Sequence, residues 1–180
     1  MSRLLYALAV GLVGAGIVHI AILFLIPAYS ERDAWSRLTE MADLYGVTPL
    51  EVPAGEKPLI RSADPFFKAI ACRFDLADGI AHVGGTGEVP FWSVSVYDRN
   101  GQNVYSFNDH TQEGTTLDFA VMTPAQIVEV RKELPAALER SVFVEANIGE
   151  GIVVIRAFAP DDSYAAIVST FLKSVSCGVV

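Results

Sequence analysis

The chain has 180 residues, with 21 acidic and 13 basic side chains and a formal charge of −8. This length accommodates one domain, and the absence of a basic run argues against nucleic-acid binding. Ten Phe, six Tyr and two Trp are enough aromatic residues for a packed core, which excludes a disordered chain. Apolar residues make up 52% of the sequence and charged residues only 19%, and one segment produces this imbalance.

That segment is Leu4–Ile26, which contains no Asp, Glu, Lys or Arg. A helix of about 20 apolar residues crosses the roughly 30 Å hydrocarbon core of a bilayer, so the segment predicts a transmembrane anchor that contacts lipid and ends at Pro27. Arg3 is the only charged side chain before it, and the positive-inside rule then places the N-terminus in the cytoplasm and the domain outside.

A cleaved signal peptide is the alternative interpretation. Ala28 and Ser30 are small residues at the positions that a signal peptidase reads, so cleavage after Ser30 would also export the domain. The apolar run is longer than the usual core of a signal peptide, which favours the anchor.

Small residues on one face of this helix predict a possible self-association surface. Ala7, Gly11 and Ala15 are spaced by four, and small side chains at that spacing let two helices approach closely. His19 continues the same face; it is either a functional group or a neutral side chain that meets water or headgroups near the outer end.

After the anchor, residues 31–46 predict an amphipathic helix beside the membrane, because apolar residues recur at helical spacing and Gly46 is a natural stop. Residues 47–61 contain three prolines and predict an extended connection. The exported domain is then predicted over 63–180.

From residue 69 the apolar period changes to two, which is typical of β-strands. Thr123, Pro124 and Gln126 predict the capped start of a helix that runs to about Glu133 and is broken at Pro135. A flexible connector is predicted at 84–88, and a last helix over 164–174. Strands are predicted over 69–76, 80–83, 91–97, 117–122, 141–145 and 151–157, the last two as a hairpin. This order predicts an α+β fold: one N-terminal transmembrane helix, then a mainly antiparallel β-sheet or sandwich with helices at its margins.

Asn100–Gly101 is the favoured pair for a two-residue hairpin turn. With that turn, Val96 lies opposite Tyr105, and apolar residues share one face of the hairpin. The other face is polar and gives the candidate ligand-binding residues, to which the adjacent His110 is added: Ser93, Ser95, Ser106, Asn108 and His110.

Ser106, Asp109 and His110 are also the residue types of a hydrolase triad. On an extended chain Ser106 and His110 are too close in sequence for an easy contact, and no nucleophile elbow precedes the serine. A strand end whose polar side chains bond their own backbone is the alternative. The spacing of Cys and His predicts no metal site, and we expect no cofactor.

Cys72 and Cys177 both lie on the exported side, where an oxidising compartment permits a disulfide. Two buried free thiols are the alternative. Cys72 shares a strand face with Phe74, so it is expected to face the core while Arg73 points to solvent. A final helix packed across the sheet would bring Cys177 close enough to pair.

The segments ADPFFKAIACRFDLADGIAHV and PFWSVSVYDRNGQNVYSFND, with the N-terminal span and the late Cys177, resemble small bacterial members of the domain of unknown function 1254 family. The resemblance covers about residues 63–160. It implies a largely β domain in the periplasm, held by one anchor in the bacterial inner membrane. It also implies a possible protein partner from the related domain of unknown function 1214 family. It carries over no activity, cofactor or catalytic residue.

These observations favour a non-enzymatic binding or interaction module of the bacterial envelope. The first alternative is a small hydrolase-like enzyme that uses the polar face of residues 91–110. The second is a ligand-binding domain that uses the same polar face, or an enclosed cavity for a small apolar molecule.

Overall fold

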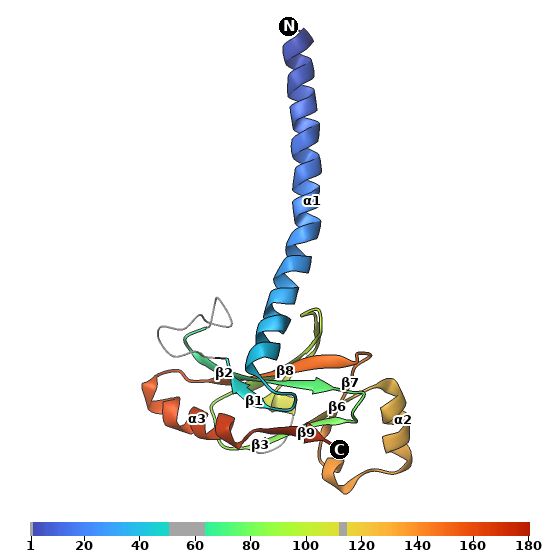
Figure 1. Cartoon of the computed structure of the whole chain (residues 1–180). Coiled ribbons are helices and arrows are strands. Elements are labelled where there is room, and N and C mark those ends of the chain that lie inside the picture. The colour runs from blue at the N-terminus through green and yellow to red at the C-terminus, as the bar shows by residue number, and fades with distance from the viewer. Residues whose placement is uncertain (1, 51–63, 112–114) are drawn as a thin grey trace.

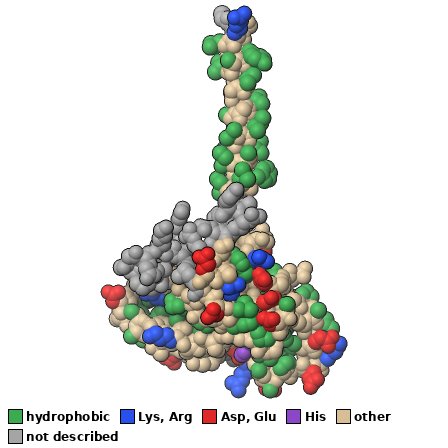
Figure 2. Space-filling model, in the orientation of Figure 1, with side chains coloured by type: hydrophobic (Ala, Val, Ile, Leu, Met, Phe, Trp, Pro, Cys, Tyr) green, Lys and Arg blue, Asp and Glu red, His purple; other side chains and the backbone are tan. Residues whose placement is uncertain are grey.

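The computed structural model of the chain describes residues 2–50, 64–111 and 115–180. A long N-terminal helix projects from a β-sandwich domain, which gives the α+β architecture predicted from the sequence (Figure 1). The helix, α1, spans Ser2–Met41. Its first part, Ser2–Ile26, has a mean hydropathy of 2.5 and is long and apolar enough to cross a membrane. Hydrophobic side chains surround this projecting part, whereas charged side chains gather on the domain (Figure 2).

The second helix predicted over 31–46 is not a separate element, because α1 continues past Pro27 and ends at Met41. A proline removes one backbone hydrogen bond from a helix, and a helix of this length retains the others. The chain leaves the helix through Tyr45, which has a φ of 61°. Its backbone N–H donates to the carbonyl of Arg73 at 2.9 Å, so the end of α1 is tied to the domain.

In the described part of the chain, the strands form two sheets. Sheet A has the order β1-β2-β8-β4-β5 and is antiparallel throughout; its strands are Val47–Pro49, Phe67–Asp75, Glu150–Phe158, Trp92–Asp98 and Asn103–Asn108. Sheet B has the order β7-β6-β3-β9, with β6 and β7 parallel; its strands are Val142–Glu145, Thr116–Met122, Ala81–Thr86 and Ser176–Val179.

The hairpin predicted from 141–145 and 151–157 is wrong, because β7 lies in sheet B and β8 in the centre of sheet A. The connecting residues cross between the sheets: Ala146 N–H donates to Met122 in sheet B, and Leu76 N–H donates to the carbonyl of Gly149. The connector predicted at 84–88 is also partly wrong, since Gly84–Thr86 belongs to β3. Both errors arise because pairing between distant strands does not appear in local periodicity.

The helices of the domain lie at the margins of the sheets (Figure 1). Helix α2 spans Pro124–Lys132 and has the predicted capping box between Thr123 and Gln126. Helix α3 spans Ala165–Ser174. Short 3₁₀ turns occupy Asp109–Thr111 (η1), Ala136–Leu138 (η2) and Asp162–Tyr164 (η3).

The main core lies between the two sheets. Phe74, Val94 and Ile155 from sheet A meet Phe119 and Val83 from sheet B, and all five are buried. In a β-sandwich, two sheets usually pack face to face about 10 Å apart, with side chains of both inner faces forming the core. The inner face of sheet A is therefore fixed by the core, and its outer face is left for other contacts.

Over most of its length the β4–β5 hairpin has the predicted register. Val96 pairs with Tyr105, and Ser95 pairs with Ser106. Val96 is buried as expected, but Tyr105 lies on an edge strand and is 41% exposed.

The predicted two-residue turn of this hairpin is wrong. The loop comprises residues 99–101 and is closed by a hydrogen bond from Asp98 N–H to the carbonyl of Gln102, with Gly101 at a φ of 79°. The Asp98 carboxylate accepts the N–H groups of Asn100 and Gln102 at 2.9 and 2.8 Å, which stabilises the longer loop. A bulge at Val104 then restores the register.

A disulfide between Cys72 and Cys177 joins the two sheets, with the Cα atoms 6.6 Å apart. The predicted pairing is present, but the expected route to it is not. Cys177 lies on β9, a strand that follows α3 and was not predicted; it pairs with Val83 of β3. Backbone hydrogen bonds between Ile80 and Val180 also hold the C-terminus.

The base of α1 packs on the outer face of sheet A. Leu38 and Ala42 are buried there against Ala71 of β2. Arg73, predicted to point into solvent, donates from Nη1 to the Ala42 carbonyl at 3.2 Å, and its guanidinium lies 5.2 Å from the ring centroid of Trp35. The helix base therefore covers the β2 side of this face, and Tyr97 of β4 packs against the same cluster. Ser106, farther along the face on β5, stays exposed.

Candidate functional site

Four of the five predicted ligand-binding residues come together on the outer face of sheet A. Ser93 pairs with Asn108, and Ser95 pairs with Ser106, so the four side chains stand on the same side of β4 and β5. The fifth, His110, lies beyond the strand end in η1, and its side chain is 85% exposed. The structure therefore separates His110 from the polar group.

Arg156, which sequence reasoning did not single out, is at the centre of this polar group. It lies on β8 directly opposite Ser93. Its Nη1 donates to Ser95 Oγ at 3.1 Å, and its Nη2 donates to the Tyr97 hydroxyl at 3.2 Å. The available signal was a single basic residue inside the apolar run of residues 151–159.

Further hydrogen bonds extend the network along β5. Ser106 Oγ donates to Ser95 Oγ at 3.1 Å, and Asn103 Nδ2 donates to Ser106 Oγ at 2.8 Å. Ser95 is only 6% exposed, whereas Ser106 lies at the surface. We call Ser95, Tyr97, Ser106 and Arg156 the arginine cluster.

The electrostatics of the arginine cluster are those of a positive site with neutral partners. Burial raises the pKa of the Tyr97 hydroxyl. Hydrogen bonds with Arg156 and Ser95 lower it, and so does the positive charge of Arg156. These lowering effects outweigh burial, so the pKa of Tyr97 lies below its ordinary value. Within the described residues, the hydrogen-bond partners of the guanidinium are hydroxyl groups and not carboxylates. The cluster can therefore stabilise a negative charge placed next to it.

The residues of the hydrolase hypothesis do not form a relay in the described structure. The Ser106 hydroxyl bonds to Ser95 and Asn103, and not to His110. His110 Nε2 lies 3.9 Å from Asp109 Oδ1, which is beyond hydrogen-bond distance. A serine nucleophile needs a base within hydrogen-bond reach, so this arrangement does not activate Ser106.

On the outer face of sheet B, His82 is used in a different contact. Its Nε2 lies 2.9 Å from Asp118 Oδ1, which also accepts a hydrogen bond from Ser141 at 2.5 Å. The carboxylate is between the imidazole and the hydroxyl, so the imidazole does not contact the serine as a general base would. Among the described residues, no three His, Cys, Asp or Glu side chains are grouped so that they could hold a metal ion.

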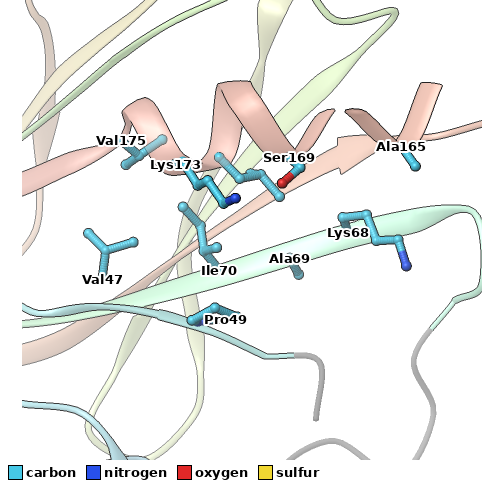
Figure 3. A pocket seen from close by; sticks show the side chains of 10 residues that line it. Val47, Pro49, Lys68, Ala69, Ile70, Ala165, Ser169, Lys173 and Val175 are labelled. Atoms are coloured by element: carbon cyan, nitrogen blue, oxygen red, sulfur yellow. The ribbon is translucent and has the colours of Figure 1, made fainter. Parts of the chain in front are cut away.

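A groove of about 530 Å³ lies between α3 and the β1–β2 edge of sheet A (Figure 3). Its apolar lining includes Val47, Ile70, Leu172 and Val175, and its basic lining includes Lys68 and Lys173. This volume is within the range of about 300–1,000 Å³ that is typical of small-molecule sites. Local sequence patterns do not indicate the groove, because its walls come from three separate segments.

Neither the models of known protein families nor the curated proteins include a match to this sequence. Among solved structures, the chain is similar to the VPA0106 protein from Vibrio parahaemolyticus, with a TM-score of 0.60 and 14% identity over 87% of this chain and 36% of that chain. It is also similar to a putative uncharacterized protein from Burkholderia cenocepacia, with a TM-score of 0.48 and 16% identity over 79% of this chain and 38% of that chain. The chain thus spans little more than a third of the length of either structure. At these identities, the likeness to VPA0106 shows a shared fold and nothing further.

Proposed function

We propose that this chain is a non-enzymatic binding module of the bacterial envelope, anchored in the inner membrane by Leu4–Ile26 with its domain in the periplasm. We further propose that the arginine cluster recognises an anionic group of its ligand. The long apolar part of α1 supports the anchor. The disulfide supports export, because such bonds persist in oxidising compartments.

The observation that carries the proposal is the environment of Arg156. Its side chain is half-buried, and two of its guanidinium nitrogens donate to the neutral hydroxyls of Ser95 and Tyr97. A partly desolvated guanidinium is stabilised by a bidentate contact with a carboxylate or phosphate, which hydroxyl groups provide only in part. An anionic ligand that approaches beside the exposed Ser106 would supply that missing contact.

The arrangement of Ser106 favours binding over hydrolysis. Its hydroxyl donates to Ser95 of the cluster or to the neighbouring Asn103, and not to an imidazole. Ser106 and Asn103 therefore serve as neutral hydrogen-bonding groups beside Arg156 in this proposal.

The resemblance to the domain of unknown function 1254 family supports a protein partner as the source of the anionic group. We propose a protein of the related domain of unknown function 1214 family, which would present a carboxylate to Arg156. Co-purification of the two tagged proteins from membranes in mild detergent tests this, and Arg156→Glu should reduce recovery of the partner.

Anion binding can be tested directly on the full chain in neutral detergent micelles. A ligand that binds only the folded state raises the melting temperature, and the rise grows as the ligand concentration exceeds the Kd. Inorganic phosphate, added at constant ionic strength against chloride, should raise the melting temperature of the wild type and of Arg156→Lys, and should have no such effect on Arg156→Gln.

Arg131, an exposed arginine on α2, provides the matched control. Arg131→Gln should keep the full response to phosphate. An equal response in Arg156→Gln would place the bound anion elsewhere and contradict the proposal.

A further inference from the structure

The groove beside α3 combines an apolar floor with polar groups on one wall. Ile70, Leu172 and Val175 are each less than 10% exposed, so the floor consists of core side chains. Ser169 and Lys173 stand one helical turn apart on α3, and Figure 3 shows both side chains directed toward the groove. This arrangement suits a molecule with an apolar body and one polar end.

The charge of the residues that line the groove determines which polar group the bound molecule should carry. Lys173 contributes an exposed basic side chain, and no Asp or Glu is found among the described residues that line the groove. Lys68 also lines the groove but already interacts with another group. A carboxylate next to Lys173 would also be within reach of the Ser169 hydroxyl, because residues at i and i+4 share one helix face. The described lining of the groove is therefore complementary to an anion and not to a cation.

The position of the groove indicates where such a molecule would come from. Val47 and Pro49 of β1 form part of the wall, and β1 follows the end of α1 after a short link. With α1 in a bilayer, sheet A is the sheet nearer the membrane, because α1 packs on its outer face, and the groove lies along the β1–β2 edge of that sheet. Single-chain amphiphiles exchange from bilayers because the affinity of one acyl chain for a membrane is marginal.

We propose that this groove binds a long-chain carboxylate, a free fatty acid, with its alkyl chain along Ile70 and Leu172 and its carboxylate between Ser169 and Lys173. This site is separate from the arginine cluster, which lies on the opposite, outer face of sheet A. Arg156→Gln should therefore leave it unchanged, so the two proposals can fail independently.

Photolabelling of the full chain in phosphatidylcholine nanodiscs tests this assignment. The probe is a palmitic acid that carries a photoreactive diazirine on its chain, and mass spectrometry locates the label. Lipid contact labels α1 in every variant, so α1 is the internal reference. We expect label on α3 and β2, and excess unlabelled palmitate should remove it. In Lys173→Gln, the ratio of label in the groove to label on α1 should fall about threefold or more, because a solvent-screened charge contact is lost.

Two further variants separate ligand binding from damage to the fold. Lys132, the last residue of α2, is the matched control, and Lys132→Gln should keep the wild-type ratio. Ala165→Phe adds a large side chain at one exposed end of the groove and should reduce labelling with all charges retained.

Charge reversal gives an outcome that a destabilised protein cannot imitate. Lys173→Glu should lose label from the fatty acid and gain it from a diazirine alkylamine of the same length. Three outcomes would overturn the proposal. The first is wild-type label confined to α1, and the second is equal labelling by the corresponding alcohol. The third is a groove-to-α1 ratio that is unchanged in both Lys173→Gln and Ala165→Phe.

Discussion

At the scale of single residues, Arg156 determines what the polar face of the β4–β5 hairpin can do. Without it, Ser95 and Ser106 are two neutral hydroxyls on a sheet surface. With it, they orient a guanidinium whose charge is only partly screened, because the cluster is half-buried. A positive site of this kind favours negative charge on any group that contacts it, including the protein's own Tyr97.

The ionisation of Tyr97 therefore reports on Arg156. Arg156→Gln removes both the hydrogen bond and the positive charge that lower the pKa of Tyr97, while burial, which raises it, remains. We expect the pKa of Tyr97 to rise in Arg156→Gln, measured by ultraviolet titration of the tyrosines with Tyr97→Phe as the reference for assignment.

The sign for stability follows from linkage. A group whose pKa is lowered by folding contributes stability above its unfolded pKa, and this contribution is lost as the pH falls through the folded pKa. Arg156→Gln should therefore lose stability relative to the wild type at alkaline pH, in addition to any change at neutral pH. A Tyr97 pKa unchanged by the substitution would contradict the contact.

At the scale of elements, sequence patterns predict correctly those features that depend on residues close together in the chain. The Thr123–Gln126 capping box and the alternation of β4 and β5 are present as predicted, since each depends on residues near in sequence. The position of β8 between β2 and β4 is not local, and so Arg156 was missed. The groove was missed for the same reason.

The turn of the β4–β5 hairpin shows a different kind of error. Asn100–Gly101 favours a two-residue turn, but the preceding Asp98 offers its carboxylate to two backbone N–H groups. The loop length depends both on the turn preference of Asn-Gly and on the hydrogen bonds that the Asp98 carboxylate offers. A rule based on the Asn-Gly dipeptide alone includes only the first of these energies.

The contact between α1 and sheet A leads to a prediction at this scale. The guanidinium of Arg73 and that of Arg99 lie 5.2 and 5.9 Å from the Trp35 ring centroid, so the ring lies close to two cations. Cation–π contacts contribute about 0.5–1 kcal/mol each at exposed sites. Trp35→Ala should therefore loosen the base of the helix.

Spin labels on the full chain measure this loosening. The native disulfide leaves only cysteines introduced at Ile26 and Val128, both exposed, to react with the label. The distance distribution between them should broaden in Trp35→Ala and stay narrow in Trp35→Phe, which keeps an aromatic ring. Equal widths in all three proteins would show that Trp35 does not orient the helix.

At the scale of the whole molecule, and in the proposed topology, the continuous α1 would determine how the domain faces the membrane. At about 1.5 Å per residue, Leu38 lies roughly 18 Å beyond Ile26 along the helix. In the proposed topology, the headgroup layer takes about 5–7 Å of that length. The outer face of sheet A, with the arginine cluster, would then face the membrane across a gap of about 10 Å, which would admit a ligand or a partner loop.

The disulfide is the covalent link between the two sheets, and its removal tests how far they depend on it. Cys72 of β2 and Cys177 of β9 are 105 residues apart in the sequence, so the bond restricts a large part of the unfolded chain. Replacing both by alanine should lower the free energy of unfolding by about 2–4 kcal/mol, measured by urea denaturation of the full chain in micelles. Reduction of the wild type should give a similar loss, and the native protein should resist alkylation until it is reduced. Alkylation of both thiols in the oxidised native protein, or an unchanged urea midpoint in the double variant, would show that the bond does not hold the sheets together.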